Sequence, residues 1–174
     1  MALKSQDVAV VLKLCEYGSK RPPYSRLAYE LCMSPSEVHA AVKRAQASHL
    51  LHGAELAQKP NLTAIEEFLV HGLKYAFPAE RGEPTRGVPT GYAAPPLRKR
   101  IAAGGELPPV WPYANGRHRG IAFEPLYKMA PAAALLDPAF YEYLALADAL
   151  REGRARERRI AEAMLIRRLR AERP

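Results

Sequence analysis

The tetrapeptide Ser34-Pro35-Ser36-Glu37 requires a helix to begin inside a stretch that otherwise has the pattern of one continuous amphipathic helix. Serine and glutamate three residues apart form a capping box, in which each side chain accepts a hydrogen bond from the backbone N–H of the other residue. Proline is favoured at the first helical position because its missing N–H would have no partner there. The sequence therefore predicts two short helices joined by a tight turn.

Apolar residues recur at helical spacing on both sides of this turn and in the segment before it. A first helix is predicted from the Ser5 cap to Gly18, with an apolar face formed by Val8, Val11, Leu12 and Cys15. A second runs from about Tyr24 to Cys32, and its apolar face contains Tyr24, Leu27, Ala28 and Leu31. In the third helix one arc is apolar and consists of Val38, Ala41, Val42 and Ala45. The opposite side of that third helix carries small residues near its start and basic residues one to two turns later.

This stretch resembles the helix-turn-helix of bacterial transcription regulators, especially the winged, MarR-like kind, over about residues 5–75. The match lies in the apolar positions Leu27, Ala28, Leu31, Met33, Val38 and Val42, while Cys32 differs from the glycine usual at the turn. The resemblance implies that the helix at about 35–48 enters the major groove of double-stranded DNA. The expected contacts are Ser36, His39, Ala40, Lys43 and Arg44. The alternative is a helical hairpin whose outer face is simply solvated.

The segment after this helix leaves little room for a wing. Residues 52–61, HGAELAQKPN, can form only a short hairpin, so a wing is either short or supplied from later in the chain. Asn61 or Thr63 then caps a fourth helix, whose inner face contains Ile65, Phe68 and Leu69. We expect this fourth helix to contribute to the core.

The charge of the chain favours an anionic partner. Among the 174 residues, 26 Lys and Arg outnumber 18 Asp and Glu, which gives a formal net charge of +8. Such an excess is consistent with nucleic-acid binding. The bases are concentrated in residues 79–120 and 151–174, on either side of an acidic stretch at 121–150. They can form two separate basic surfaces or one surface assembled by folding or dimerisation.

Residues 78–120 contain too many prolines and glycines for a long helix. We predict an extended, partly ordered arm, in which Tyr92, Trp111 and Tyr113 indicate that some of it packs. Additional nucleic-acid contacts are possible at Arg98, Lys99, Arg100, Arg117 and Arg119. A solvated linker is the alternative.

The C-terminal part is predicted to be helical after a short strand within residues 119–127, RGIAFEPLY. Asp137-Pro138 begins a helix that ends at Gly153, and an arginine-rich helix follows. That last helix can dimerise, dock on an acidic partner or lie solvated. A homodimer is expected because two recognition helices give more specificity than one. Its surface would come from Phe140, Tyr143, Leu144 and Leu150, or from Val10 and Leu14, unless these residues pack on the protein's own core.

Several classes of function lack support in the sequence. Cys15 and Cys32 lie in helical patterns and indicate no disulfide framework, so we expect a reducing cytoplasm. We expect no membrane segment, because no apolar run is long enough to span a bilayer. His49 and His52 lack further ligands at metal spacing, and no cofactor-binding or nucleophile motif occurs, so we predict no metal, no cofactor and no enzymatic activity.

These observations combine into a mainly α fold of three parts. Residues 1–77 form a winged helix-turn-helix domain, 78–120 a basic Pro/Gly-rich arm or linker, and 121–174 a C-terminal helical segment. The predicted function is sequence-specific regulation of transcription in the cytoplasm, by a homodimer bound to double-stranded DNA. The alternative is a protein-interaction module or antitoxin-like partner protein that binds through residues 151–174. A ligand-responsive regulator is a third possibility, since the aromatic-containing middle can line a pocket.

Overall fold

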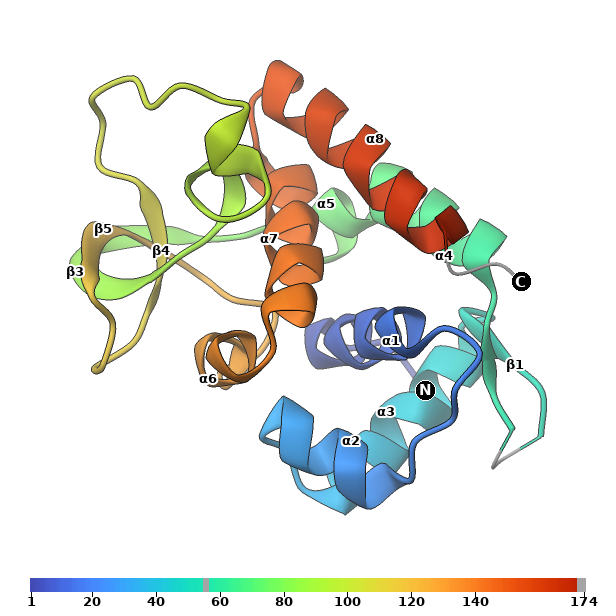
Figure 1. Ribbon diagram of the computed structural model, residues 1–174. Helices are drawn as coiled ribbons and strands as arrows, with labels where there is room; N and C mark the ends of the chain where they lie inside the picture. Colours follow the sequence, from blue (N-terminus) through green and yellow to red (C-terminus); the bar gives the residue numbers. More distant parts are fainter. Residues whose placement is uncertain (55–56, 172–174) are drawn as a thin grey trace.

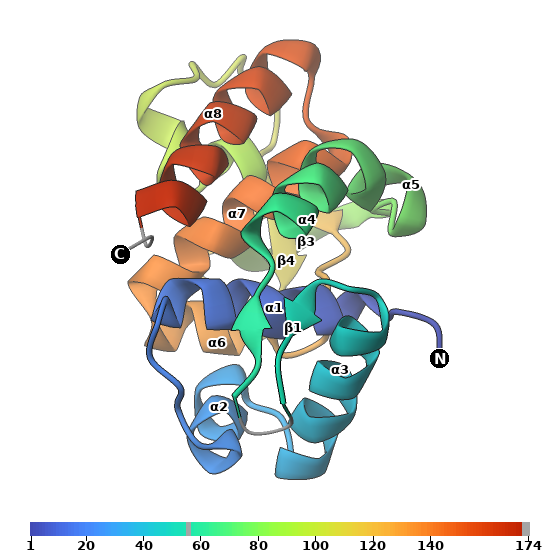
Figure 2. The ribbon, with the colours of Figure 1, turned by 90° about the vertical axis from the view of Figure 1, so that its right-hand side faces the viewer.

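The computed structural model describes residues 1–54 and 57–171, and within them the chain is mainly helical with two small β-structures (Figure 1). The elements occur in the order α1 Ser5–Tyr17, α2 Tyr24–Leu31, α3 Pro35–Ala47, β1 Leu51–His52, β2 Lys59–Pro60, α4 Leu62–Glu67, the π-helical turn η1 Phe68–Gly72, α5 Leu73–Ala76, β3 Arg81–Pro89, the 3₁₀ turns η2 Gly91–Ala93 and η3 Leu97–Lys99, β4 Pro109–Pro112, β5 His118–Phe123, α6 Ala130–Leu136, α7 Pro138–Glu152 and α8 Ala155–Ala171. Figure 2 shows α2 and α3 at one end of the molecule, α8 at the other, and β1 beside α1 between them.

The predicted capping box at the start of α3 is confirmed. The Ser34 hydroxyl accepts a hydrogen bond from the Glu37 backbone N–H at 3.2 Å, and the Glu37 carboxylate accepts one from the Ser34 N–H at 2.8 Å. Cys32 ends α2 in the left-handed conformation, with φ 53° and ψ 42°. A cysteine therefore adopts the backbone conformation that glycine usually supplies at such a turn.

Helix α1 lies in the interior of the protein, with α2 and α3 on one side of it and α7 on the other (Figure 1). Every residue from Asp7 to Cys15 is buried. The prediction that Val10 and Leu14 form part of a dimer surface is therefore wrong, because both side chains are buried in the protein's own core. The N-terminal cap also differs from the prediction: Ser5 is the first helical residue, and the Lys4 backbone N–H donates to the Asp7 carboxylate at 2.8 Å.

The middle segment forms a small closed sheet rather than an extended arm or a solvated linker. Strand β3 pairs antiparallel with both β4 and β5, and β4 pairs with β5 in parallel. Pro84 lies at an irregularity of the β3–β5 register, where its missing N–H disrupts the ladder least. Gly87 is required by close packing, because a Cβ atom there would lie 1.9 Å from the Trp111 carbonyl oxygen.

A buried network anchors this sheet to α7. Asp148 accepts hydrogen bonds from the Trp111 indole N–H at 2.7 Å and from the Thr90 hydroxyl at 2.6 Å. Its other oxygen accepts from the Arg151 guanidinium at 2.8 Å. The predicted packing of Trp111 is confirmed, and the strand predicted near 119–127 corresponds to β5. Burial of the aspartate is offset by three donors, so the sheet is fixed to the helix.

Helix α7 packs on α1, and α8 packs on α7 and α4. Asp137 caps α7, as predicted, because its Oδ1 atom accepts from the N–H groups of Ala139 and Phe140 at 3.0 and 3.1 Å. The residues of α7 predicted to form a dimer surface are instead buried in the core of the same chain: Phe140, Tyr143, Leu144 and Leu150. Several elements contribute to this burial, among them α1 and α8, whose Leu165 and Leu169 are buried in the same hydrophobic cluster.

One hydrophobic cluster runs through residues 1–77, 78–120 and 121–174 alike. Side-chain bonds cross between these segments as well. The Tyr127 hydroxyl donates to the carbonyl oxygen of Leu31, at the C-terminal end of α2, at 3.0 Å. Arg170 on α8 donates to Glu66 on α4 at 3.0 Å. The three segments therefore share a core.

A buried lysine connects three helices at the centre. The ammonium of Lys13 on α1, 1% exposed, lies 2.9 Å from Glu16 and 3.1 Å from Glu30 on α2, and it donates to the Oδ2 atom of Asp137. We call these four residues the Lys13 cluster. Burial raises the pKa of Glu16 to about 7, although the neighbouring Lys13 acts in the opposite direction. The pKa of Asp137 is lowered, because hydrogen bonds from Lys13 and the Phe140 N–H outweigh the effect of its burial.

The raised pKa of Glu16 predicts a dependence of stability on pH. Between about 4.5 and about 7 the folded protein retains a proton on Glu16 that the unfolded chain has released. The free energy of unfolding should therefore fall as the pH rises through this window. Urea denaturation at several pH values measures this slope. Glu16→Gln should flatten it, whereas Glu67→Gln, at an exposed position of α4, should not; an unchanged slope in Glu16→Gln would contradict the assignment.

Candidate nucleic-acid interface

The outer face of α3 consists of Ser36, His39, Ala40, Lys43 and Ala47, and it points away from α1. Ser36, Lys43 and Ala47 are exposed, while His39 and Ala40 are half-buried. The arc of α3 formed by Val38, Ala41, Val42 and Ala45 is buried against the core, as the helical spacing predicted. Four of the five predicted contact residues thus lie on one accessible helix face.

Arg44 does not belong to this face. Its guanidinium binds Asp7 in a two-pronged ion pair, with Nε–Oδ2 and Nη2–Oδ1 distances of 2.8 Å each. Arg44 is 9% exposed and Asp7 is 0% exposed. The expectation that Arg44 contacts DNA is therefore corrected: its charge neutralises a buried carboxylate and ties the start of α1 to α3.

His39 extends the outer face of α3 towards α2. Its ring centroid lies 5.7 Å from that of Tyr24, the first residue of α2, with the planes tilted by 51°. Both side chains are half-buried, so they can present polar atoms outward while their rings pack together. The face near the start of α3 therefore includes the beginning of α2 as well.

The short hairpin that follows α3 adds basic residues beside it. Strand β1 pairs antiparallel with β2, and His52 lies opposite Lys59 with both side chains exposed. The hairpin is attached to α3, because the Gln46 amide donates to the Gly53 carbonyl oxygen at 2.7 Å. The expected shortness of the hairpin is confirmed, since each strand has two residues. The sequence predicted this short hairpin but did not identify its residues Lys59 and His52 as candidate contacts.

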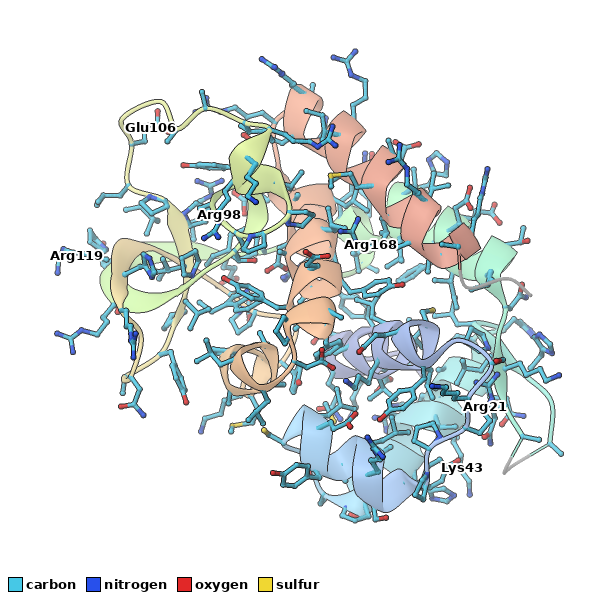
Figure 3. All side chains as sticks on the ribbon, viewed as in Figure 1. Arg21, Lys43, Arg98, Glu106, Arg119 and Arg168 are labelled. Atoms are coloured by element: carbon cyan, nitrogen blue, oxygen red, sulfur yellow. The ribbon has the colours of Figure 1, made fainter. Side chains whose placement is uncertain are left out.

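The second basic set, Arg98, Lys99, Arg100, Arg117 and Arg119, is exposed but lies elsewhere. Figure 3 places Arg98 and Arg119 at the sheet side of the molecule and Lys43 at the opposite end. The outer face of α3 and the second basic set are therefore separate regions of one copy. Of the two base-rich segments, 79–120 and 151–174, the first contacts the second where η3 meets α8. The second set is not continuous with the outer face of α3.

Comparisons with known protein families, with curated proteins and with solved structures found no match to this chain. Within residues 1–54 and 57–171, no cluster of His, Cys, Asp or Glu is arranged to hold a metal ion. In the same residues no helix combines the length and the apolar character that crossing a bilayer requires.

The Arg44–Asp7 pair predicts that Arg44 acts on stability. Arg44→Ala should lower the free energy of unfolding by about 3–5 kcal/mol, because it leaves the buried Asp7 carboxylate without its counter-charge. Lys43→Ala, one residue away and exposed, should change it by less than about 0.5 kcal/mol. Denaturant titration measures both. Adding Asp7→Asn to Arg44→Ala should recover part of the loss, and additive losses in the double variant would argue against the pair.

Proposed function

We propose that the protein is a sequence-specific, double-stranded DNA-binding regulator of transcription, and that residues 5–60 act as a winged helix-turn-helix. The observation that carries this proposal is the outer face of α3, an accessible helix face braced by α1 and α2 and followed directly by a hairpin. In this arrangement α3, about residues 35–48, is the recognition helix and β1–β2 is the wing. A recognition helix needs such bracing to hold its outer face in the major groove.

The side chains of α3 suit this role in a definite order along the helix. Ser36 and Ala40 are small and lie near the N-terminus, so they permit close approach of the helix to base edges and phosphates. Lys43 follows about two turns from the start and can reach a phosphate or a base edge. Lys59 and His52 on the hairpin are exposed beside α3 and suit the phosphates that flank the groove.

A direct test uses the two exposed lysines near the groove. Lys43→Ala and Lys59→Ala should each weaken binding to duplex DNA, and each should lower the salt slope of the binding constant by about one unit. Fluorescence anisotropy over a range of salt concentrations measures both quantities. Arg167→Ala, an exposed base on α8, is the matched control and should leave the slope unchanged. Equal slopes in all variants would contradict the interface.

A single copy offers few positive charges at this interface, because Arg44 is engaged by Asp7. Adequate affinity and specificity therefore favour two copies on two half-sites. The apolar residues of α7 and α1 that the sequence suggested for a dimer contact are buried in the core, so a dimer would use another surface. Exposed large apolar side chains remain on α2 and α6, two elements in contact, where Tyr29 is 76% and Leu136 60% exposed. We propose this surface as the dimer contact.

The dimer is tested by light scattering over micromolar concentrations with and without duplex DNA. The intact chain should show twice the monomer mass of 19.3 kDa. Leu136→Glu should reduce the mass to that of a monomer, because a charge is costly to bury in an apolar contact. Ala102→Glu, at an exposed position between η3 and β4, is a control that should leave it unchanged. A monomer under all conditions rules the dimer out.

A second candidate function is docking on an acidic protein through α8. Its supporting observation is that Arg156, Arg159 and Arg167 remain exposed on this helix, whereas Arg168 pairs with Glu142 at 2.6 Å and Arg170 with Glu66. Arginines in the first turn of a helix also oppose its dipole, which is unfavourable without a partner. Because Leu165 and Leu169 are buried, this candidate is tested by charge substitutions on α8 rather than by its deletion.

A further inference from the structure

A pocket of about 370 Å³ lies between the closed sheet, the η2–η3 segment and the helices α6 and α7. Its walls are mostly apolar and are formed by Val88, Pro89, Ala93, Pro95, Leu135 and Tyr141. Arg98, which lines it, is far from Lys43 in Figure 3. The pocket is therefore distinct from the outer face of α3. Its volume is at the lower end of the range for small-molecule sites, so it suits a single ring or a short chain.

Basic and amide side chains surround the apolar walls. Arg98, Arg117, His118 and Asn115 line the pocket and are exposed. Among the described residues that line it there is no carboxylate. Other arginines of the chain do have carboxylate partners, such as Arg81 with Glu152 at 2.8 Å. Two guanidinium groups beside an apolar hollow thus leave positive charge for an anionic ligand to neutralise.

The wall formed by Tyr141 is fixed and uncharged. Its hydroxyl donates to the Pro89 carbonyl oxygen, and its ring centroid lies 5.7 Å from that of the buried Trp111. Burial raises the pKa of Tyr141 to about 12, and the nearby positive charge of Arg98 only partly counters this effect. At neutral pH the phenol is therefore neutral and contributes no negative charge that would repel an anion.

The floor of the pocket is preformed. Gly116 packs directly on Gly87, so that a Cβ atom on Gly116 would lie 2.4 Å from the Gly87 carbonyl oxygen. Gly87 lies on β3. Thr90, which follows β3, and Trp111 on the neighbouring β4 both donate hydrogen bonds to Asp148 of α7. A pocket held open in this way avoids much of the ordering cost of ligand binding.

We propose that this pocket binds a small organic carboxylate, with the apolar ring or chain between Leu135 and Tyr141 and the carboxylate at Arg98 and Arg117. Arginine binds a carboxylate through paired N–H donors, and the adjacent apolar walls select an anion that carries an apolar body over a bare inorganic anion. Nothing in this assignment depends on DNA binding, and the site can be tested in the free protein.

Benzoate, benzamide and inorganic phosphate are suitable probes, titrated into ¹⁵N-labelled full-length protein and followed by NMR. Benzoate should cause saturable shifts of the Gly116 and His118 amides and of the Trp111 indole, residues at or beside the pocket. Benzamide, which keeps the ring but lacks the charge, should bind at least about tenfold more weakly. Phosphate should likewise shift these signals only at much higher concentration.

Two double variants that remove the same number of positive charges distinguish binding in the pocket from non-specific attraction of benzoate to a basic protein. Arg98→Gln with Arg117→Gln should weaken benzoate binding at least about tenfold, through loss of charge-assisted hydrogen bonds. Arg159→Gln with Arg167→Gln, at exposed positions on α8, should leave it unchanged. Leu135→Ser should also weaken it, by removing part of the apolar wall. The proposal is overturned if benzoate does not saturate, if benzamide or phosphate binds equally well, or if the α8 variant loses as much affinity.

Discussion

The buried ammonium of Lys13 is the contact on which the relative placement of the helices depends. It lies on α1 and joins Glu30 of α2 to Asp137, the residue that caps α7. A charge buried this deeply is tolerated only when carboxylates surround it, and removal of Lys13 would leave the three carboxylates Glu16, Glu30 and Asp137 close together without a counter-charge. The cluster therefore favours one arrangement of α2 against α7.

A second buried ion pair acts at the other end of the same helix. Asp7 binds Arg44, so α1 is tied to α3 near its start and to α2 and α7 near its end. Between these two positions the helix is apolar and packed on all sides. Ion pairs of this kind contribute less to stability than their geometry suggests, because both charges lose water. The directional bonds of the Arg44–Asp7 pair nevertheless fix the position of α3 against the start of α1.

Most features that local contacts determine were predicted from the sequence, with the cap of α1 as an exception, since Lys4 and not Ser5 occupies that position. The Ser34 and Asp137 caps, the turn at Cys32 and the buried arc of α3 all depend on residues at most four positions apart. Arg44 was misjudged because its partner lies 37 positions away in the chain, and an arginine on the border of a helix face has the same pattern whether it faces water or a buried aspartate. Local periodicity carries no information about that choice.

The middle segment and the dimer surface were misjudged for a related reason. Strands β3 and β5 pair Arg81 with Phe123, although η2, η3 and β4 lie between the two strands in the sequence, and their prolines and glycines hide the alternation by which strands are normally predicted. Because the sequence did not predict this sheet, the apolar side chains of α7 outnumbered those that the predicted helices alone could bury. The sheet, α1 and α8 supply the missing cover, which is why Phe140 and Leu144 are buried without a second copy. The sequence suggested that the middle segment can line a pocket, but the walls that α6 and α7 add, Leu135 and Tyr141, could not be predicted for the same reason.

The hydrogen bond from Tyr127 to Leu31 has a consequence for how this protein can evolve. A helix ends with carbonyl groups that need donors, and here a residue from the second half of the chain supplies one to α2 just before the turn. In this chain the segment from α1 to α3 and the C-terminal half complete each other's hydrogen bonds and core, so gene fusion or domain shuffling that separates them would leave both parts incomplete. The two halves are expected to be inherited together.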